Sequence, residues 1–253
     1  MANPLDFMAR KFRSRGLLND RGLAALLRLP YAPRTYDAPA YLVREGVTDP
    51  KVCSLLVSGY AFRQKLTFDG ARQIVSLHMR GDLIDLQHLF LDRADHNVQA
   101  LTRVETIDIE RAALRELILA EPSIGEAMWV DALVDASIYR EWIVNVGRRG
   151  AKARIAHLLC EFATRQRVAG LGDGRSCHLP MTQEQLGDTV GLTSVHVNRT
   201  LKALVEDGVI QRDKREISFS DWERIRLVGD FSDLYLHLDQ SEKAAAPVQR
   251  YAG

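Results

Sequence analysis

The chain lacks the features of a secreted, membrane-spanning or zinc-binding protein. Its 253 residues include only 3 cysteines, Cys53, Cys160 and Cys177, whose wide spacing fits neither a disulfide framework nor a zinc motif. Its apolar runs are too short to cross a bilayer. The charged first residues are not followed by the apolar segment of a secretory signal. We therefore expect a cytoplasmic protein with no membrane partner.

Recognisable catalytic motifs are also missing. The sequence contains no P-loop, no dinucleotide-binding fingerprint and no visible nucleophile–base set, so we expect a protein that is not an enzyme. The formal net charge of +1 does not by itself suggest a nucleic-acid partner. However, residues 148–226 hold 14 Lys and Arg against 10 Asp and Glu. A local positive excess of this kind would help to neutralise DNA phosphates.

The most informative segment is residues 182–202, which predict two short helices around a tight turn. Thr182 and Gln185 form a capping-box pattern at the start of the first helix. Gly187 lies where the helices would cross, and Gly191 lies where the turn needs a positive φ. A small apolar core would come from Leu186, Val190, Leu192, Val197 and Leu201. Together these features predict a helix-turn-helix, which lays its second helix in the DNA major groove.

Residues 31–110 have the pattern of an antiparallel β structure. Short β-rich runs alternate with turn residues, and Asp69-Gly70 is a strong hairpin signal. A short helix is predicted before this region over 19–29, and another after it over 111–120. We interpret the region as a small barrel or jelly roll.

Helical patterns connect this region to the helix-turn-helix. Residues 123–146 predict one long helix, with Pro122 at its first turn and Gly147 at its C-terminal end. Residues 150–168 predict another helix. After the helix-turn-helix, a β-hairpin with Arg-Asp-Lys-Arg at residues 212–215 would form a basic wing, followed by a last short helix.

The predicted fold class is therefore α+β. It comprises an N-terminal antiparallel β-barrel or jelly roll, a long dimerisation helix and a C-terminal winged helix-turn-helix. The predicted divisions are an N-terminal helix with a sensor barrel, the dimerisation helix, the DNA-binding domain and a flexible tail. Their bounds are 1–121, 122–147, 148–240 and 241–253.

The long helix is apolar on more than one face. A surface helix needs only one apolar stripe, so a helix with two is expected to be buried on two sides. One side would pack on the barrel and the other on a second copy of the chain. The predicted dimer-interface residues are Trp129, Leu133, Val134, Ile138 and Trp142. A single helix in the middle of a monomer core is the alternative.

This order of elements resembles the Crp/Fnr (cyclic-AMP receptor/fumarate-nitrate regulator) family of bacterial transcription regulators. The resemblance covers about residues 20–230 and is most specific over LPMTQEQLGDTVGLTSVHVNRTLKALVEDGVI, residues 179–210. RIAHLLCEF, residues 154–162, also resembles the helix that leads into the family's DNA-binding domain. The resemblance implies a homodimer on an inverted-repeat site in double-stranded DNA, a barrel that senses a signal, and contact with RNA polymerase.

The ligand-binding positions of the family's cyclic-nucleotide binders differ here. Those members have a Gly-Glu pair soon after a Gly-Asp turn, then an Arg-Ser or Arg-Thr pair, for the ribose and the cyclic phosphate. After its Gly-Asp turn this chain has Asp85-Leu86 and His96-Asn97 at those places. Leu86 cannot accept a ribose hydrogen bond, and His96 is a weaker phosphate partner. We therefore expect an unknown effector other than cyclic AMP, with Asp85, Leu86, His96 and Asn97 as pocket candidates.

No cofactor is predicted. The family's oxygen sensors hold an iron–sulfur cluster with N-terminal cysteines, whereas the first cysteine here is Cys53. His78, His88 and His96 could ligate metal or haem, but their spacing matches no short metal motif, which favours ordinary packed histidines. Cys177 is either a redox switch or, as the simpler interpretation, an ordinary cysteine.

The second helix of the helix-turn-helix would read the DNA bases. Candidate base-reading residues are Ser194, Val195, His196 and Arg199, and candidate backbone contacts are Thr182, Thr193, Lys202, Arg212, Lys214 and Arg215. Arg199 matches the family's recognition arginine and suits guanine. The family commonly has Glu and Ser or Gly where this chain has Val195 and Asn198. We therefore expect a retained guanine and a changed preference at another base.

Two other functions stay open at this point. One is a small cupin-like barrel enzyme with a metal held by His78, His88 and His96. The other is an adaptor whose helix-turn-helix contacts only proteins.

Overall fold

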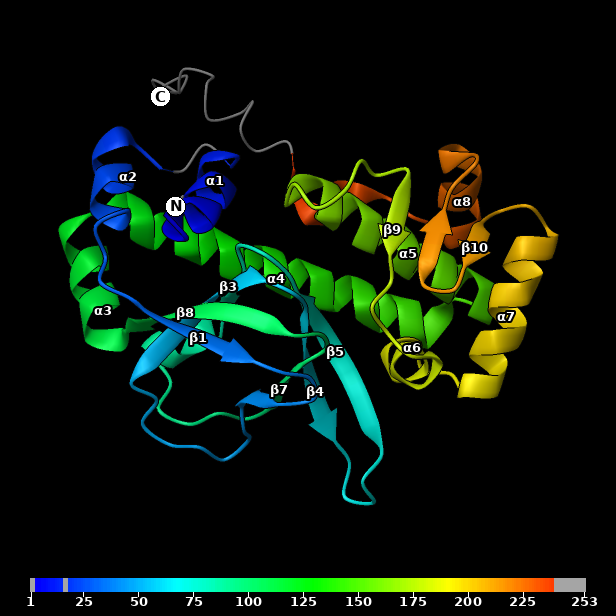
Figure 1. Cartoon of the computed structure of the whole chain (residues 1–253), viewed down its shortest axis with the longest axis horizontal. Helices are drawn as coiled ribbons and strands as arrows, with labels where there is room; N and C mark the ends of the chain where they lie inside the picture. Colours follow the sequence, from blue (N-terminus) through cyan, green and yellow to red (C-terminus); the bar gives the residue numbers. More distant parts are fainter. Residues whose placement is uncertain (1–2, 16–17, 239–253) are drawn as a thin grey trace, which may run out of the picture.

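The computed structural model describes residues 3–15 and 18–238 and contains a β-rich part and a helical part joined by one long helix, α4 (Pro122–Arg148) (Figure 1). Two short helices, α1 (Leu5–Arg13) and α2 (Asp20–Leu26), lie beside α4. The sequence predicted α2 but not α1. The predicted flexible tail, 241–253, lies outside the described residues. Within the described residues, no helix combines the length and apolar character needed to span a membrane.

The β-rich part consists of two four-stranded antiparallel sheets. One has the order β1 (Ala32–Tyr36), β8 (Val104–Glu110), β3 (Val52–Ser58), β6 (Leu83–Ile84). The other has the order β2 (Tyr41–Val43), β7 (Asn97–Ala100), β4 (Ala61–Leu66), β5 (Arg72–His78). Leu56, Ile84 and Val104 of the first sheet pack against Ala61 and Val98 of the second. The predicted antiparallel jelly-roll architecture is confirmed.

Local turn signals in the β-rich part were interpreted correctly. Asp69-Gly70 closes the hairpin between β4 and β5, where Gly70 has a φ of +86°. A short 3-10 helix, η1 (Leu86–Leu89), follows β6. Helix α3 (Arg111–Ala120) continues directly from β8, as the pattern over 111–120 predicts.

Helix α4 begins at Pro122, whose fixed φ and missing N–H suit the first turn. It does not stop at Gly147 but continues to Arg148. Arg149 is extended, and α5 (Ala151–Val168) begins after Gly150. The two long helices are thus joined by only two residues.

The two apolar faces of α4 have different environments. Val134, Ile138 and Trp142 are 4%, 6% and 7% exposed and belong to the chain's own core. Trp129 and Leu133 are 70% and 60% exposed. Because a helix turns by about 100° per residue, these two groups lie on nearly opposite faces. The prediction of a dimer contact is therefore wrong for Val134, Ile138 and Trp142, because this chain already covers them.

The exposed face of α4 extends along the helix. Trp129, Leu133 and Ile143 fall within one stripe, and Ile143 is also largely exposed. Sequence periodicity detects two stripes but cannot say which one the chain covers by itself.

The C-terminal part packs on the inner face of α4 through α5. Its helices are α6 (Gln183–Val190), α7 (Ser194–Glu206) and α8 (Trp222–Gly229), followed by the 3-10 helix η2 (Asp233–Leu236). The predicted hairpin is present as β10 (Gln211–Asp213) and β11 (Glu216–Ser218). An additional strand, β9 (Ser176–His178), pairs with β11 and completes a three-stranded sheet. Sequence analysis predicted no strand there.

Helix α5 forms the centre of this part. Most of its residues from Ile155 to Thr164 are buried, and Glu161 is 1% exposed. The Glu161 carboxylate accepts hydrogen bonds from Trp142 Nε1 and from Tyr235 Oη, each at 2.8 Å. It therefore joins α4, α5 and η2 at a single buried point.

The helix-turn-helix also contacts the β-rich part directly. Arg72 Nε at the start of β5 lies 2.7 Å from Asp188 Oδ2 on α6. Gln73 Nε2 donates to the backbone oxygen of Asp188 at 2.7 Å. The β4–β5 hairpin and the first helix of the helix-turn-helix are thus held side by side, as Figure 1 shows.

Candidate nucleic-acid interface

The helix-turn-helix has the local geometry that its sequence predicts. Gln185 N donates to Thr182 Oγ1 at 3.1 Å, and Thr182 N donates to Gln185 Oε1 at 2.9 Å, which completes the capping box. Gly191 ends α6 with a φ of +68°. Thr193 caps α7 by accepting from His196 N at 3.3 Å.

Gly187 fixes how closely the two helices approach. A Cβ at this position would lie 2.3 Å from the backbone oxygen of Leu192, a distance that real Cβ atoms essentially never show. The turn after α6 therefore fits against α6 only because residue 187 has no side chain. Leu186, Val190, Val197 and Leu201 fill the core beneath, as predicted.

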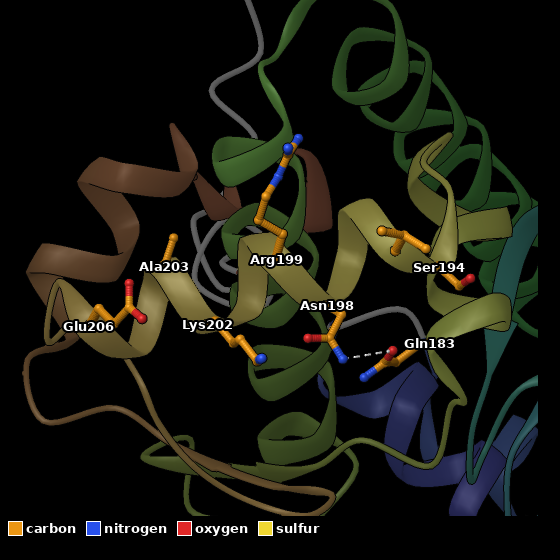
Figure 2. Close-up of a pocket in the computed structure, with 8 residues that line it drawn as sticks. Gln183, Ser194, Asn198, Arg199, Lys202, Ala203 and Glu206 are labelled. Carbon is orange, nitrogen blue, oxygen red and sulfur yellow. Dashed lines mark hydrogen bonds between the residues drawn. The ribbon is translucent and has the colours of Figure 1, made fainter.

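Helix α7 presents a shallow groove lined by polar and charged side chains on one face (Figure 2). The groove is lined by Gln183, Ser194, Val195, Asn198, Arg199, Lys202, Ala203 and Glu206. Arg199 is exposed and Val195 is 79% exposed, so both are available to a ligand in the groove. Because a guanidinium donates paired hydrogen bonds, Arg199 has the chemistry to read guanine O6 and N7.

Only some of the predicted base-reading residues line this groove. Ser194, Val195 and Arg199 line the groove, whereas His196 does not. Lys202, predicted to contact the DNA backbone, lines the same groove. Thr193 is exposed at the start of α7, although its hydroxyl is already used as a cap.

Sequence reasoning did not place Gln183, Ala203 and Glu206 in this groove, and it named Asn198 only as a position that differs from the family. Asn198 Nδ2 donates to Gln183 Oε1 at 3.2 Å, which ties α7 to the start of α6 (Figure 2). Ala203 and Glu206 continue the same face towards the end of the helix. The helical spacing from Ser194 onwards would have indicated these two positions. The contact between Gln183 and Asn198 depends on how two helices pack and leaves no local signal.

The basic wing lies beside the start of α6. A second, smaller depression is lined by Thr182, Arg212, Lys214 and Arg215 together with apolar neighbours. Lys214 has a φ of +52° in the tight turn between β10 and β11. Four of the predicted backbone-contacting residues are thus brought together from two separate elements.

The predicted effector residues are largely buried, and two of them are paired with each other. Asp85 and His96 are buried, and Asp85 Oδ1 lies 2.7 Å from His96 Nε2 and 3.2 Å from Arg63 Nη2. Although burial alone would raise the pKa of Asp85, the hydrogen bond to His96 and the charge of Arg63 lower it. Asn97 accepts a hydrogen bond from the backbone N–H of Glu45 at 3.0 Å. Leu86, in η1, is half-buried. Protein groups therefore occupy Asp85 Oδ1, His96 Nε2 and Asn97 Oδ1, whereas the buried Asp85 Oδ2 has no hydrogen-bond partner among the described residues.

The three cysteines and the candidate metal ligands His78, His88 and His96 are built into the interior. Burial, followed by the nearby charge of Arg63, lowers the pKa of His78 to about 3, so His78 is neutral. Among the residues that the structure describes, no three His, Cys, Asp or Glu side chains are grouped as metal ligands. Cys177 is buried, and burial raises the pKa of its thiol to about 12. A thiol of this kind reacts slowly, which favours the interpretation of Cys177 as an ordinary cysteine.

Comparisons with known proteins agree with this arrangement. The cyclic nucleotide-binding domain matches residues 33–121, and the Crp-like helix-turn-helix domain matches residues 153–228. The transcriptional activator protein FnrL of Cereibacter sphaeroides is 30% identical over 216 residues, which cover 83% of this chain and 86% of that protein. The chain belongs to the Crp/Fnr family.

Further similarities extend over most of this Crp/Fnr chain. The nitrogen fixation regulation protein FixK of Rhizobium meliloti is 27% identical over 202 residues, covering 78% of this chain and 87% of that protein. The solved structure of FixK2 from Bradyrhizobium japonicum superposes with a TM-score of 0.73 and 22% identity, covering 81% of this chain and all of that one. The protein is a transcription regulator with a helix-turn-helix DNA-binding domain and is not an enzyme, so the cupin-like and adaptor alternatives are wrong.

Proposed function

We propose that this Crp/Fnr-type regulator binds an inverted-repeat operator as a homodimer. The observation that carries the proposal is the exposed apolar stripe of α4, which lies opposite the face that the chain covers by itself. Large exposed apolar patches mark sites of association. A twofold contact along α4 would place two recognition helices about one helical turn of DNA apart.

Arg199 is proposed as the main sequence-reading residue. It is exposed on the groove-lining face of α7 and has no carboxylate partner within salt-bridge distance among the described residues. Val195 can contribute an apolar contact, such as one to a thymine methyl group. Asn198 is held by Gln183, so it is less free to choose a base. We therefore expect each half-site to retain one strongly selected guanine.

The test begins with selection of binding sites from random duplex DNA, followed by fluorescence anisotropy with the selected duplex. Arg199→Ala is expected to weaken specific binding by about 10–100-fold, because a bidentate contact contributes about 1–3 kcal/mol of discrimination. Arg34→Ala removes an exposed arginine from β1 and serves as the control. If selection yields no inverted repeat, or if both variants bind like wild type, the proposal is wrong.

The regulatory signal is proposed to differ from cyclic AMP. The pairing of Asp85 with His96 supports this, because it occupies groups that would otherwise meet a ribose and a phosphate. Calorimetric titration with cyclic AMP should give no binding in the micromolar range. A micromolar, stoichiometric signal would contradict this part of the proposal.

We also propose that the regulator acts as an activator in the cytoplasm, in contact with RNA polymerase. The names of the relatives, transcriptional activator protein FnrL among them, support an activating role. Transcription in vitro from a promoter with the selected operator, using purified polymerase, would test this. Reduced transcript on addition of the regulator would argue for a repressor instead.

A further inference from the structure

A cavity of about 600 Å³ lies where the sensor, the dimerisation helix and the DNA-binding part meet. Its walls come from α1, the turn between β5 and β6, the middle of α4, the end of α5 and the segment at η2. Asp85, Leu86, His96 and Asn97 are not among its lining residues. Its volume is in the range of sites that hold small molecules.

Two arginines in this cavity have no acidic partner within the part of the chain that the structure describes. Arg10 on α1 and Arg80 after β5 both stack on Phe7, with guanidinium carbons 5.0 Å and 4.8 Å from the ring centroid. Neither has a carboxylate within salt-bridge distance among residues 3–15 and 18–238. Unneutralised guanidinium groups at a concave surface favour an anionic ligand, because they can donate paired hydrogen bonds to it.

The other cations of the cavity are already paired with carboxylates. Lys11 Nζ lies 2.8 Å from Asp82 Oδ1 and 2.9 Å from Asp131 Oδ1. Arg165 Nη2 lies 3.3 Å from Asp82 Oδ2 and donates to the backbone oxygen of Leu77 at 2.8 Å. These pairs join α1, the β-rich part, α4 and α5 around the cavity. They leave Arg10 and Arg80 as the cations available to a ligand; Asp135 on α4 also lines the cavity, so the anionic group of a ligand is expected on the α1 side, at the two arginines.

The rest of the cavity wall is largely apolar. Met79, Val134, Ile138 and Leu236 line it and are buried in the chain. An anion without an apolar portion would leave this wall exposed to water. The site therefore suits a molecule that combines an anionic group with an apolar body.

We propose that this junction cavity binds a small amphiphilic anion, with its charged group on Arg10 and Arg80 and its apolar body against α4 and η2. Such a ligand would contact both the sensor part and the DNA-binding part. It can shift the DNA-binding equilibrium only if it binds one arrangement of these parts more tightly than another. This regulatory consequence rests on the proposed DNA-binding function, whereas the binding site itself does not.

The binding site can be tested with full-length protein and two probes, without DNA. The fluorescent anion 8-anilinonaphthalene-1-sulfonate should bind with one site per chain and a micromolar Kd. Decanoate should displace it, whereas inorganic phosphate should not, because phosphate has no apolar body. Arg10→Ala combined with Arg80→Ala should weaken binding of both probes by at least about tenfold, since two charge-assisted contacts are lost.

Matched variants separate this site from general dye binding. Arg13→Ala combined with Arg34→Ala removes the same charge from exposed positions that do not line the cavity. This control should bind like wild type. Arg10→Glu reverses one exposed charge and should also weaken binding if the double variant fails to fold. Weak, non-saturable binding, no binding, or equal binding by the cavity and control variants would overturn the proposal.

DNA binding is measured separately, by anisotropy with the selected duplex in the presence and absence of decanoate. A change of affinity that is lost in the Arg10/Arg80 variant would support regulation through the cavity. Unchanged DNA affinity together with stoichiometric decanoate binding would overturn regulation but retain the site. Failure of all DNA binding would instead contradict the proposed function.

Discussion

Replacement of Asp135 by Asn should stabilise the protein at neutral pH. Asp135 lies on α4 at the junction cavity and has no hydrogen-bond or ion-pair partner among the described residues. Burial, followed by the negative charge of Asp131, raises the pKa of Asp135 to about 6. The ionised form is therefore unfavourable in the folded protein, and asparagine removes the charge while retaining the shape.

The size and sign of this effect follow from the shift in pKa. The pKa rises from 3.8 in the unfolded reference to about 6 in the folded chain. At about 1.4 kcal/mol per unit, this gives a ceiling of about 3 kcal/mol. Because the side chain is only half-buried, we expect about 1–2 kcal/mol. The folded state binds more protons between pH 4 and pH 6, so its stability falls as pH rises through that window.

Urea unfolding of wild type and Asp135→Asn at several pH values would measure this. The variant should be more stable by about 1–2 kcal/mol at pH 7.5, and the difference should vanish as the pH approaches 4. Asp37→Asn, at an exposed loop position, is the control and should change stability little at any pH. A variant no more stable than wild type at pH 7.5, or a difference independent of pH, would refute the reasoning.

Four other outcomes are expected. Gly187→Ala should cost about 2–4 kcal/mol and abolish DNA binding, because its Cβ would lie 2.3 Å from the Leu192 oxygen. Gly147→Ala, within α4 and with nothing within 4 Å, should instead raise the melting temperature, since alanine favours helix by about 0.5–1 kcal/mol. Leu133→Glu should convert the proposed dimer to folded monomers in analytical ultracentrifugation, whereas Leu227→Glu, at a more exposed position on α8, should not. Lys202→Ala should reduce the slope of log affinity against log salt by about 1 without changing the preferred sequence, and a lost preference would contradict its assignment as a phosphate contact.

The helix-turn-helix could be predicted from sequence because its signals are local. Thr182 with Gln185 and Thr193 act within one helical turn, and Gly191 supplies a backbone angle that few other residues adopt. Gly187 depends on a contact only five residues away. Each cap, turn angle and close contact involves residues only a few positions apart in the sequence, so the sequence pattern and the structure agree.

The features that were missed depend on contacts between distant parts of the chain. Lys11 joins α1 to Asp82 and Asp131, which lie 71 and 120 residues further along the chain. Strand β9 has three residues and exists because it pairs with β11. The buried face of α4 becomes distinguishable from its exposed face only when α5 and the β-rich part are in place. Sequence periodicity contains none of this information.

Only two residues connect α4 and α5, so a small rotation at this connection would move the far end of α5 by a much larger distance. Helix α5 has 18 residues and, at about 1.5 Å per residue, is about 27 Å long. A rotation of about 10° at the connection would move its far end by about 5 Å, more than the rise of about 3.4 Å per base pair. Arg149 restrains this pivot by ion pairs to Glu141 at 2.7 Å and to Asp230 at 3.0 Å. A rotation of this size would require the contacts of α5 with α4 and the β-rich part, such as those of Glu161 with Trp142 and of Arg165 with Asp82, to rearrange, and it would take a recognition helix out of register with its half-site.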